Sequence, residues 1–330
     1  MRNRNRHHAF VTCAVTAIAL LSAAMMPASA QSDYPNRPIR VIVGFAAGGG
    51  TDIFARLVGA KLSQLLGQPV VIENKPGAGG RLAAEYAARQ APDGYTLMVA
   101  PTGAMSIAAA IYPDLPYQPI ETFTPLGMVA GYPLIMVVAA NHPARTVHEL
   151  IEWAKQHPDR ANYASTAPSF TIATELFKLE SGMPGLMIPY KSSNEMTFSV
   201  INGQTMVALA DPPPVVPQAK AGTIRALAVT GDEPLPELPD VPSMAAAGYK
   251  NMDVHLWNGA FAPAATPGTI VAKLQNAVGE AVRDAGVSEK LKNLATTPGG
   301  GTPEQFKAMI AAEIVRYKSV VERANLHFEE

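Results

Sequence analysis

The feature that most constrains the fold is an apolar segment followed by three consecutive glycines and a helical pattern. Residues 41–45 (VIVGF) are typical of a buried strand, residues 46–52 (AAGGGTD) of a tight turn, and residues 53–62 of a helix with one apolar face. A helix that begins in such a turn leaves its first backbone N–H groups without partners inside the helix. Because the helix dipole places positive charge at the same end, the turn predicts a binding site for an anion.

The order of strand, glycine-containing turn and helix continues along the chain. Further strands are expected at residues 68–73 and 95–100, with a helix at 81–90 between them. This alternation predicts an α/β fold with a parallel sheet. The turns after parallel strands meet at one edge of the sheet, so we expect three turns to lie together there: Ala47–Asp52, Pro76–Gly80 and Pro101–Ala104.

The first 30 residues are predicted to be an export signal that is removed after Ala30. They contain Arg2, Arg4 and Arg6, an apolar run over residues 9–21, and the small residues Ala28-Ser29-Ala30 before the cleavage point. Loss of the three arginines changes the formal charge from −1 to −4, and the single cysteine, Cys13, is lost with them. The exported chain is therefore expected to have no disulfide, and its charge gives no indication of nucleic-acid binding.

The remaining chain is long enough to divide into two lobes. A second series of strands and helices occupies residues 133–230, and we expect the strands at 133–140 and 257–263 to cross between the lobes. The predicted first lobe comprises residues 31–132 and 254–330. The predicted second lobe comprises residues 133–253.

Several polar residues of the second lobe are candidates for a site. Ser165, Thr166, Ser169 and Thr171 precede a helix expected at 172–180, so one of them is expected to cap the helix and the others to be available to a ligand. Asp211 ends an expected strand inside the candidate cleft, where it is either a turn residue or a group that orients water.

Motifs of common enzymes and cofactor-binding proteins do not occur. Residues 44–51 match the spacing of a phosphate-binding loop, but Gly50 stands where that loop needs its lysine. Neither glycine turn gives the dinucleotide-binding spacing, and there is no nucleophile elbow or H-E-x-x-H motif. The histidines that follow the export signal share no metal-ligand spacing: His142, His148, His157, His255 and His327. We therefore expect no catalytic residue, metal or cofactor. The alternative interpretation of residues 46–52 is purely structural: a tight turn between strand and helix, with Asp52 as the helix cap.

Six motifs occur in order along the chain. They are F-A-A-G-G-G-T-D (45–52), V-V-I-E-N-K-P-G-A-G-G (70–80), A-P-D-G-Y-T-L (91–97), I-P-Y-K-S-S (188–193), I-R-A-L-A-V-T (224–230) and F-A-P-A-A-T-P (261–267). Together they resemble the Bug receptors, which are periplasmic solute-binding proteins of the tripartite tricarboxylate transporter type. The resemblance implies a two-lobed, Venus-flytrap fold of type II-like form, with a parallel-rich sheet in each lobe and two crossover strands.

The resemblance also implies which residues meet the ligand. A carboxylate would be held by the first turn and by the facing loop Ser165–Thr171. That loop departs from the family pattern, because residues 167–177 keep Glu175-Leu-Phe177 but lack the usual histidine and glycines, and Phe170 suggests a more apolar end. The full set of predicted ligand-binding residues is Phe45, Gly48, Gly49, Gly50, Thr51, Asp52, Gly79, Thr102, Ser165, Thr166, Ser169, Thr171, Tyr190 and Asp211.

The predicted function is capture of a small carboxylate between the lobes of a periplasmic, monomeric binding protein, for uptake or sensing. The expected partners are the membrane components of a tripartite carboxylate transporter or a sensor kinase, and not nucleic acid. Two alternatives are an exported enzyme that acts on a carboxylate, with Asp52, Tyr190 or Asp211 as acid or base, and a sensor that presents its occupancy to a membrane partner.

Overall fold

The structure is a computed structural model that describes residues 34–323, so the predicted export signal and His327 lie outside the described residues. Residues up to Asn36 are grouped apart from the rest of the chain, and the description below concerns the unit from Arg37 onward. This unit has an α/β architecture with two lobes, each built on one β-sheet. No helix within residues 34–323 is long and apolar enough to cross a membrane.

The first sheet has six strands in the order β11-β4-β10-β3-β1-β2. The strands are β1 (Ile39–Val43), β2 (Val70–Asn74), β3 (Thr96–Pro101), β4 (Phe123–Pro133), β10 (His255–Pro263) and β11 (Thr297–Pro298). β1 pairs in parallel with β2 and β3, whereas β10 is antiparallel to both β3 and β4, and β11 is antiparallel to β4. The sheet is therefore mixed and not parallel-rich as predicted, because the chain returns from the other sheet along β10 in the opposite direction.

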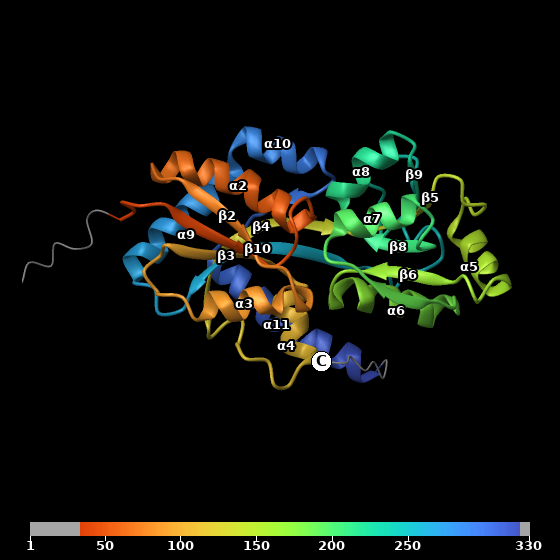
Figure 1. Cartoon of the computed structure of the whole chain (residues 1–330), viewed down its shortest axis with the longest axis horizontal. Coiled ribbons are helices and arrows are strands. Elements are labelled where there is room, and N and C mark those ends of the chain that lie inside the picture. The colour runs from red at the N-terminus through yellow and green to blue at the C-terminus, as the bar shows by residue number, and fades with distance from the viewer. Residues whose placement is uncertain (1–33, 324–330) are drawn as a thin grey trace, which may run out of the picture. The chain divides into compact units, whose positions relative to one another are not determined.

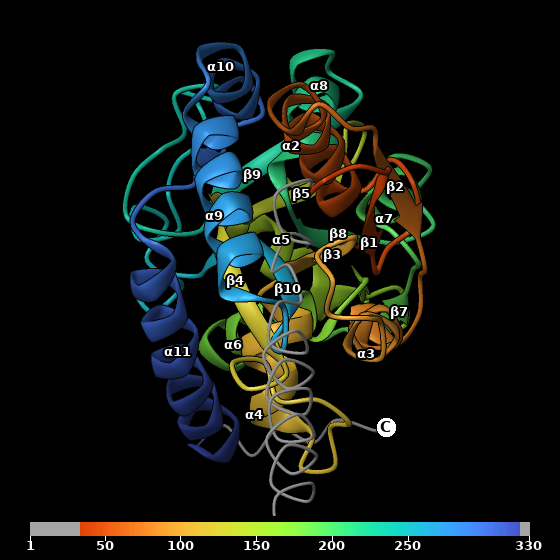
Figure 2. The same ribbon diagram turned by 90° about the vertical axis from the view of Figure 1, so that its left-hand side faces the viewer.

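Helices cover both faces of the first sheet. Figures 1 and 2 show α2 and α9 on one face and α3 and α11 on the other. An aromatic core packs between the sheet and α11, where the rings of Trp257 and Phe306 meet edge to face at 4.9 Å. The helices of this lobe are α2 (Gly50–Leu66), α3 (Arg81–Ala88), α4 (Ala108–Ile111), α9 (Gly268–Arg283), α10 (Ala285–Asn293) and α11 (Pro303–Arg323), with a 3₁₀ turn η2 (Ala78–Gly80) and a π-helical turn η3 (Gly103–Ile107).

The second sheet has five strands in the order β7-β6-β8-β5-β9 and is also mixed. β6 is parallel to β7 and β8, whereas β5 is antiparallel to β8 and β9. Its strands are β5 (Ile135–Ala139), β6 (Asn162–Ser165), β7 (Leu186–Pro189), β8 (Val207–Ala210) and β9 (Ile224–Val229). Its helices are α5 (Val147–Gln156), α6 (Pro168–Ser181), α7 (Ser193–Ile201) and α8 (Pro212–Lys220).

One helix of this lobe begins earlier than the sequence pattern predicts. α6 starts at Pro168, so Ser169 and Thr171 belong to its first turn and not to a loop. α8 also starts with proline, at Pro212, directly after Asp211. Proline fits the start of a helix because the first N–H groups have no partner within the helix.

Two connections join the sheets. β4 ends at Pro133 and β5 begins at Ile135, so Leu134 alone separates them, and the chain returns between β9 and β10. Buried Thr230 binds both connections: its hydroxyl accepts from the Leu134 N–H at 2.8 Å and donates to the Val254 carbonyl at 2.6 Å, and its own N–H donates to the Leu134 carbonyl. The two crossings are therefore fixed to each other at one point.

Candidate functional site

A cavity of about 260 Å³ lies where loops of the two lobes meet. The first lobe contributes Gly44, Phe45 and the second glycine turn, Pro76–Gly79. The second lobe contributes Thr166, Tyr190 and Lys191. Four of the predicted ligand-binding residues line this cavity: Phe45, Gly79, Thr166 and Tyr190.

The second glycine turn has an unusual backbone. Ala78, Gly79 and Gly80 follow one another with φ angles of 47°, 62° and 94°, all in the left-handed region that residues with a side chain rarely adopt. The Gly80 N–H donates to the Gly77 carbonyl, but the N–H groups of Gly77, Ala78 and Gly79 have no backbone acceptor among residues 34–323. Successive N–H groups in a turn of this kind form a concave surface that suits an anion.

The second-lobe wall of the cavity is polar. The Thr166 hydroxyl is buried and has no hydrogen-bond partner among the described residues. The Tyr190 hydroxyl pairs with the Thr205 hydroxyl at 3.0 Å, and Thr205 in turn pairs with Ser199 at 2.8 Å. Exposed Lys191 is the one charged residue of the lining. The cavity therefore combines free N–H donors, an unpartnered hydroxyl and a cation.

The Asp52 carboxylate supports the first glycine turn from inside the first lobe. It is buried and accepts hydrogen bonds from the Gly48 N–H (3.0 Å), Arg56 Nε (2.8 Å) and Asn74 Nδ2 (2.8 Å). Burial acts to raise the pKa of Asp52, but the hydrogen bonds from Arg56, Gly48 and Asn74 outweigh it and hold the pKa below its usual value. These bonds use the carboxylate within its own lobe, so Asp52 fixes the shape of the turn.

The first glycine turn packs directly against the second lobe. A Cβ atom added to Gly50 would lie 1.8 Å from Oδ2 of Asp211, and one added to Gly49 would lie 3.4 Å from Cβ of Ser192. Gly48 lies near Asn194 on the same side. The structure thus brings Gly48, Gly49 and Gly50 together with Asp211, but these residues and buried Thr51 are not among those that line the 260 Å³ cavity.

Three of the remaining predicted residues use their hydroxyl groups within their own lobes. Thr102 accepts from the Trp257 N–H at 2.8 Å and donates to the Trp257 carbonyl, which ties the end of β3 to β10. Ser165 donates to the Ala167 carbonyl and pairs with Thr171 at 2.8 Å. Ser169, in contrast, lies at a lobe contact, because a Cβ atom added to Gly103 would be 2.9 Å from its Oγ.

Asp211 lies in an unusual position at the start of α8. It is the N-cap residue, but the next three residues are prolines and offer it no N–H donors, so its side chain makes no cap hydrogen bond. The side chain is 2% exposed and Oδ1 has no partner among the described residues. Burial raises the pKa of Asp211 to about 6, although a hydrogen bond from the Ser193 side chain acts in the opposite direction.

Gly44, residues 76–78 and Lys191 line the cavity but were not among the predicted residues. Two of the motifs, K-P-G-A-G-G and I-P-Y-K-S-S, contain most of them, so the sequence signal was present. The left-handed conformation of Ala78 has no such signal, because alanine does not favour it.

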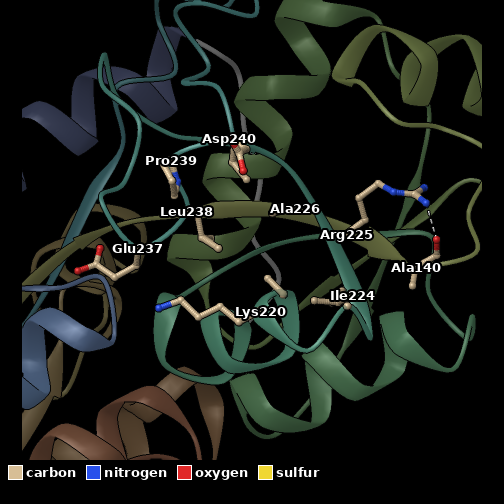
Figure 3. Close-up of a pocket in the computed structure, with 12 residues that line it drawn as sticks. Ala140, Lys220, Ile224, Arg225, Ala226, Glu237, Leu238, Pro239 and Asp240 are labelled. Atoms are coloured by element: carbon tan, nitrogen blue, oxygen red, sulfur yellow. Dashed lines mark hydrogen bonds between the residues drawn. The ribbon is translucent and has the colours of Figure 1, made fainter.

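A second cavity, of about 450 Å³, lies entirely within the second lobe (Figure 3). Its Arg225 guanidinium donates to the carbonyl oxygens of His142, Ala144 and Ala140 at 2.5–2.9 Å, which holds the group against the backbone of its own lobe (the bond to Ala140 is drawn in Figure 3). No first-lobe residue lines this cavity, and a ligand there would not join the lobes. Within residues 34–323 there is no group of histidine, cysteine or carboxylate side chains that could hold a metal ion.

The match to a known family agrees with this geometry. A family described as the tripartite tricarboxylate transporter family receptor matches residues 54–326. The chain belongs to this family. Its members are solute-binding receptors of the periplasm and not enzymes, and the resemblance to the Bug receptors is thereby confirmed.

Individual relatives match the receptor over nearly its whole length. Protein BugT of Bordetella pertussis is 33% identical over 311 residues, which cover 93% of this chain and 95% of BugT. The structure of the periplasmic binding protein BugD has a TM-score of 0.86 at 30% identity, covering 90% of this chain and 100% of BugD. Rpa4515 of R. palustris, solved with adipate, has a TM-score of 0.85 at 33% identity, covering 89% of this chain and 99% of that one.

Proposed function

We propose that the receptor captures a small carboxylate in the cavity between its lobes and presents it to the membrane components of a tripartite carboxylate transporter. The observation that carries this proposal is the cavity of about 260 Å³, which joins both lobes and offers unused N–H groups at Gly77, Ala78 and Gly79. The adipate found with the relative Rpa4515 supports a carboxylate as the ligand.

One carboxylate group would bind to the second glycine turn and to the Thr166 hydroxyl, with the Lys191 ammonium nearby. Hydrogen bonds to a charged group contribute about 1.5–3 kcal/mol each. Three or four of them would give roughly micromolar affinity once the cost of closing the lobes is subtracted. In this arrangement the first glycine turn acts mainly by packing against the second lobe, and Gly48 to Asp52 would contribute to ligand binding indirectly.

The moving parts would be the two lobes, comprising residues 31–132 with 254–330 and residues 133–253. Rotation about the connections at Leu134 and Thr230 would open the cavity, and closure would trap the ligand. The β4–β5 crossing is a single residue, Leu134, and Thr230 joins it to the start and the end of the longer β9–β10 connection, which suits a hinge with one axis.

A ligand screen tests the proposal. Adipate and other mono-, di- and tricarboxylates are added to the exported chain, and its melting temperature is measured, since a ligand that binds only the folded state raises it. We expect adipate or a close relative to raise the melting temperature. A screen in which no carboxylate does so would refute carboxylate capture in this cavity.

The Thr166→Val variant tests whether the Thr166 hydroxyl contributes to ligand binding. The substitution keeps the shape of the side chain but removes the unpartnered hydroxyl, so calorimetry should show weaker binding of the carboxylate found in the screen. Thr223→Val is the matched control, because the Thr223 hydroxyl bonds only to Gln218 within the second lobe. Equal losses in the two variants would contradict the role of Thr166.

Location and partners complete the proposal. We propose that the chain is exported to the periplasm, is cleaved after Ala30 and works as a monomer. Intact mass of the secreted protein tests the cleavage site, because the chain should begin at Gln31. Complex formation with a sensor kinase only in the presence of ligand would assign the receptor to sensing instead of uptake.

A further inference from the structure

The contact between Asp211 and the start of α2 joins the lobes outside the ligand cavity. Asp211 belongs to the second lobe, and its carboxylate lies against Gly50, the first residue of α2 in the first lobe. The α2 N-cap, Gly49, provides no side-chain hydrogen bond, and the N–H groups of Gly50, Thr51 and Asp52 have no backbone acceptor among the described residues. A side chain of the second lobe therefore lies where the helix start would attract an anion.

The surroundings of Asp211 include side chains of the first lobe. The pKa of the Tyr132 phenol on β4 is raised, mainly by burial and secondly by the negative charge of Asp211. Tyr132 therefore lies close to Asp211. Tyr132 accepts a hydrogen bond from Asn258 Nδ2 at 3.0 Å, and its ring lies 5.6 Å from that of Phe54 on α2. In the lobe opening proposed above, these first-lobe groups would leave Asp211 and water would replace them.

Among residues 34–323, no cation compensates the buried carboxylate. Oδ1 of Asp211 has no partner there, and the influences on its pKa are burial, a hydrogen bond from the Ser193 side chain on α7 and one from its own backbone. The charged groups on the helices packed against it are used elsewhere. Asp52 and Arg56 on α2 bind each other, and the Glu195 carboxylate on α7 accepts from the Lys191 N–H. An ionised Asp211 would therefore be buried without a counter-charge, which is costly.

We propose that Asp211 is a latch that holds the lobes together, and that its carboxyl group takes up a proton as they close. Protonation removes the uncompensated charge in the closed form, whereas the open form exposes the carboxylate to water. The α2 dipole favours the ionised form, but burial is the largest influence on the pKa of Asp211 and raises it. Lower pH should therefore favour closure, because the closed form binds the proton more tightly.

The size of the effect follows from the two pKa values. If Asp211 in the open form has its usual pKa of 3.8 and in the closed form a pKa of about 6, the ratio of closed to open molecules rises as pH falls through 6 and levels off below 3.8. By linkage, this ratio should increase about tenfold between pH 8 and pH 5, with about twofold of that between pH 8 and pH 6.

Distance measurements between two spin labels test the proposal without any ligand. Because the exported chain has no cysteine, labels can be placed at Val71→Cys on β2 and Leu186→Cys on β7, two exposed positions on different lobes. In the otherwise native protein, the short-distance population should grow as pH falls from 8 to 5. A distance distribution that does not change over this range would overturn the proposal.

Two further variants assign the pH effect to Asp211. Asp211→Asn cannot ionise and should give a closed population that is independent of pH, while Asp240→Asn, at an exposed carboxylate of the same lobe, should behave like the native chain. Histidine side chains also titrate in this range. Because the Asp211→Asn protein keeps all of them, a pH effect caused by histidine would persist in this variant. A pH response that persists in Asp211→Asn would refute the assignment to Asp211. Since no ligand is used, failure of the carboxylate screen would leave this result unaffected.

Discussion

Gly50→Ala should separate closure of the lobes from the stability of each lobe. The added Cβ would lie 1.8 Å from Oδ2 and 3.0 Å from Cγ of Asp211, whereas non-bonded carbon and oxygen atoms need more than 3 Å. Closure of the variant therefore requires the Asp211 carboxylate, or α2 itself, to move by more than an ångström. Forcing an extra methyl group into a packed contact costs about 1–3 kcal/mol.

This cost should appear in ligand binding and not in unfolding. Binding requires closure, so an added cost of about 1–3 kcal/mol weakens affinity about 5–150-fold. In the open form the alanine contacts nothing of the second lobe, and at the start of a helix it should stabilise the chain by about 0.4–1 kcal/mol through the unfolded state. Without ligand, Gly50→Ala should therefore have an unchanged or higher melting temperature. Its affinity for the ligand should be much weaker.

Gly268→Ala is the matched control. Gly268 is the first residue of α9, as Gly50 is of α2, and a Cβ added there meets no atom within 4 Å. Calorimetry with the carboxylate found in the ligand screen should give native affinity for Gly268→Ala and reduced affinity for Gly50→Ala. Adding Asp211→Ala to Gly50→Ala removes the obstructing carboxylate, so the two substitutions should be non-additive. Native affinity of Gly50→Ala would refute the interpretation that this contact forms on closure.

Two other substitutions test the supports of the site by urea denaturation. Asp52→Ala leaves the Gly48 N–H, Arg56 and Asn74 without their shared acceptor and should cost about 1–3 kcal/mol at pH 7. The pKa of Asp52 is lowered from 3.8 in the folded chain, so the native protein should lose this extra free energy of unfolding as pH falls below 3.8. If Asp52→Ala is less stable than the native protein by the same amount at pH 7 and pH 3, the ionic role of Asp52 is contradicted. Thr230→Val leaves the Leu134 N–H without an acceptor and should also cost about 1–3 kcal/mol, whereas Thr230→Ser keeps the hydroxyl. Equal stability of the valine and serine variants would exclude a role for the hydroxyl at the crossings.

Most strands could be predicted because their signal is local. The apolar runs at 41–45, 95–100 and 224–230 match β1, β3 and β9 to within two residues at each end. β4 was not among the strands expected from the sequence. Its sequence includes two prolines and two glycines, which are unfavourable in a strand, and it forms because β10 pairs along its whole length with two register shifts. That pairing depends on a partner more than 120 residues away, which no local pattern encodes.

The end of the chain shows the same limit. After the strand at 257–263 the structure has three helices, since α9 ends at Arg283 and α10 starts at Ala285, and the break between these two is not evident from the apolar pattern. Asp284 caps α10 through the N–H groups of Gly286 and Val287. The capping pair at the start of α11 has a recognisable pattern, T-P-E-Q at 302–305, and in the structure Thr302 and Gln305 exchange hydrogen bonds at 3.2 and 2.8 Å. Caps are encoded by a few neighbouring residues and are therefore visible in a sequence.

The site could be predicted only in part, because it depends on how the lobes meet. The glycines of the first turn stand out in the sequence, and the turn was predicted to bind an anion through the first N–H groups of the helix. The structure gives another physical reason for Gly50, since the space of its missing side chain is filled by Asp211 of the other lobe. The residues that line the cavity come from two stretches of the chain, 44–79 and 166–191, which are more than 80 residues apart, and only the fold brings them together.

The two glycine turns therefore have different tasks in the proposed mechanism. The turn at Gly48–Asp52 is fixed internally by its carboxylate and packs against the second lobe, so changes there should alter closure for every ligand alike. The residues Gly77, Ala78 and Gly79, whose N–H groups have no backbone acceptor among the described residues, line the cavity, as do Thr166 and Lys191 of the other lobe, so changes there should alter which ligand is bound. If this division holds, Gly50→Ala should weaken the binding of all carboxylates by the same factor. Lys191→Gln should instead weaken them unequally, most strongly those with a second carboxylate within reach of the ammonium group.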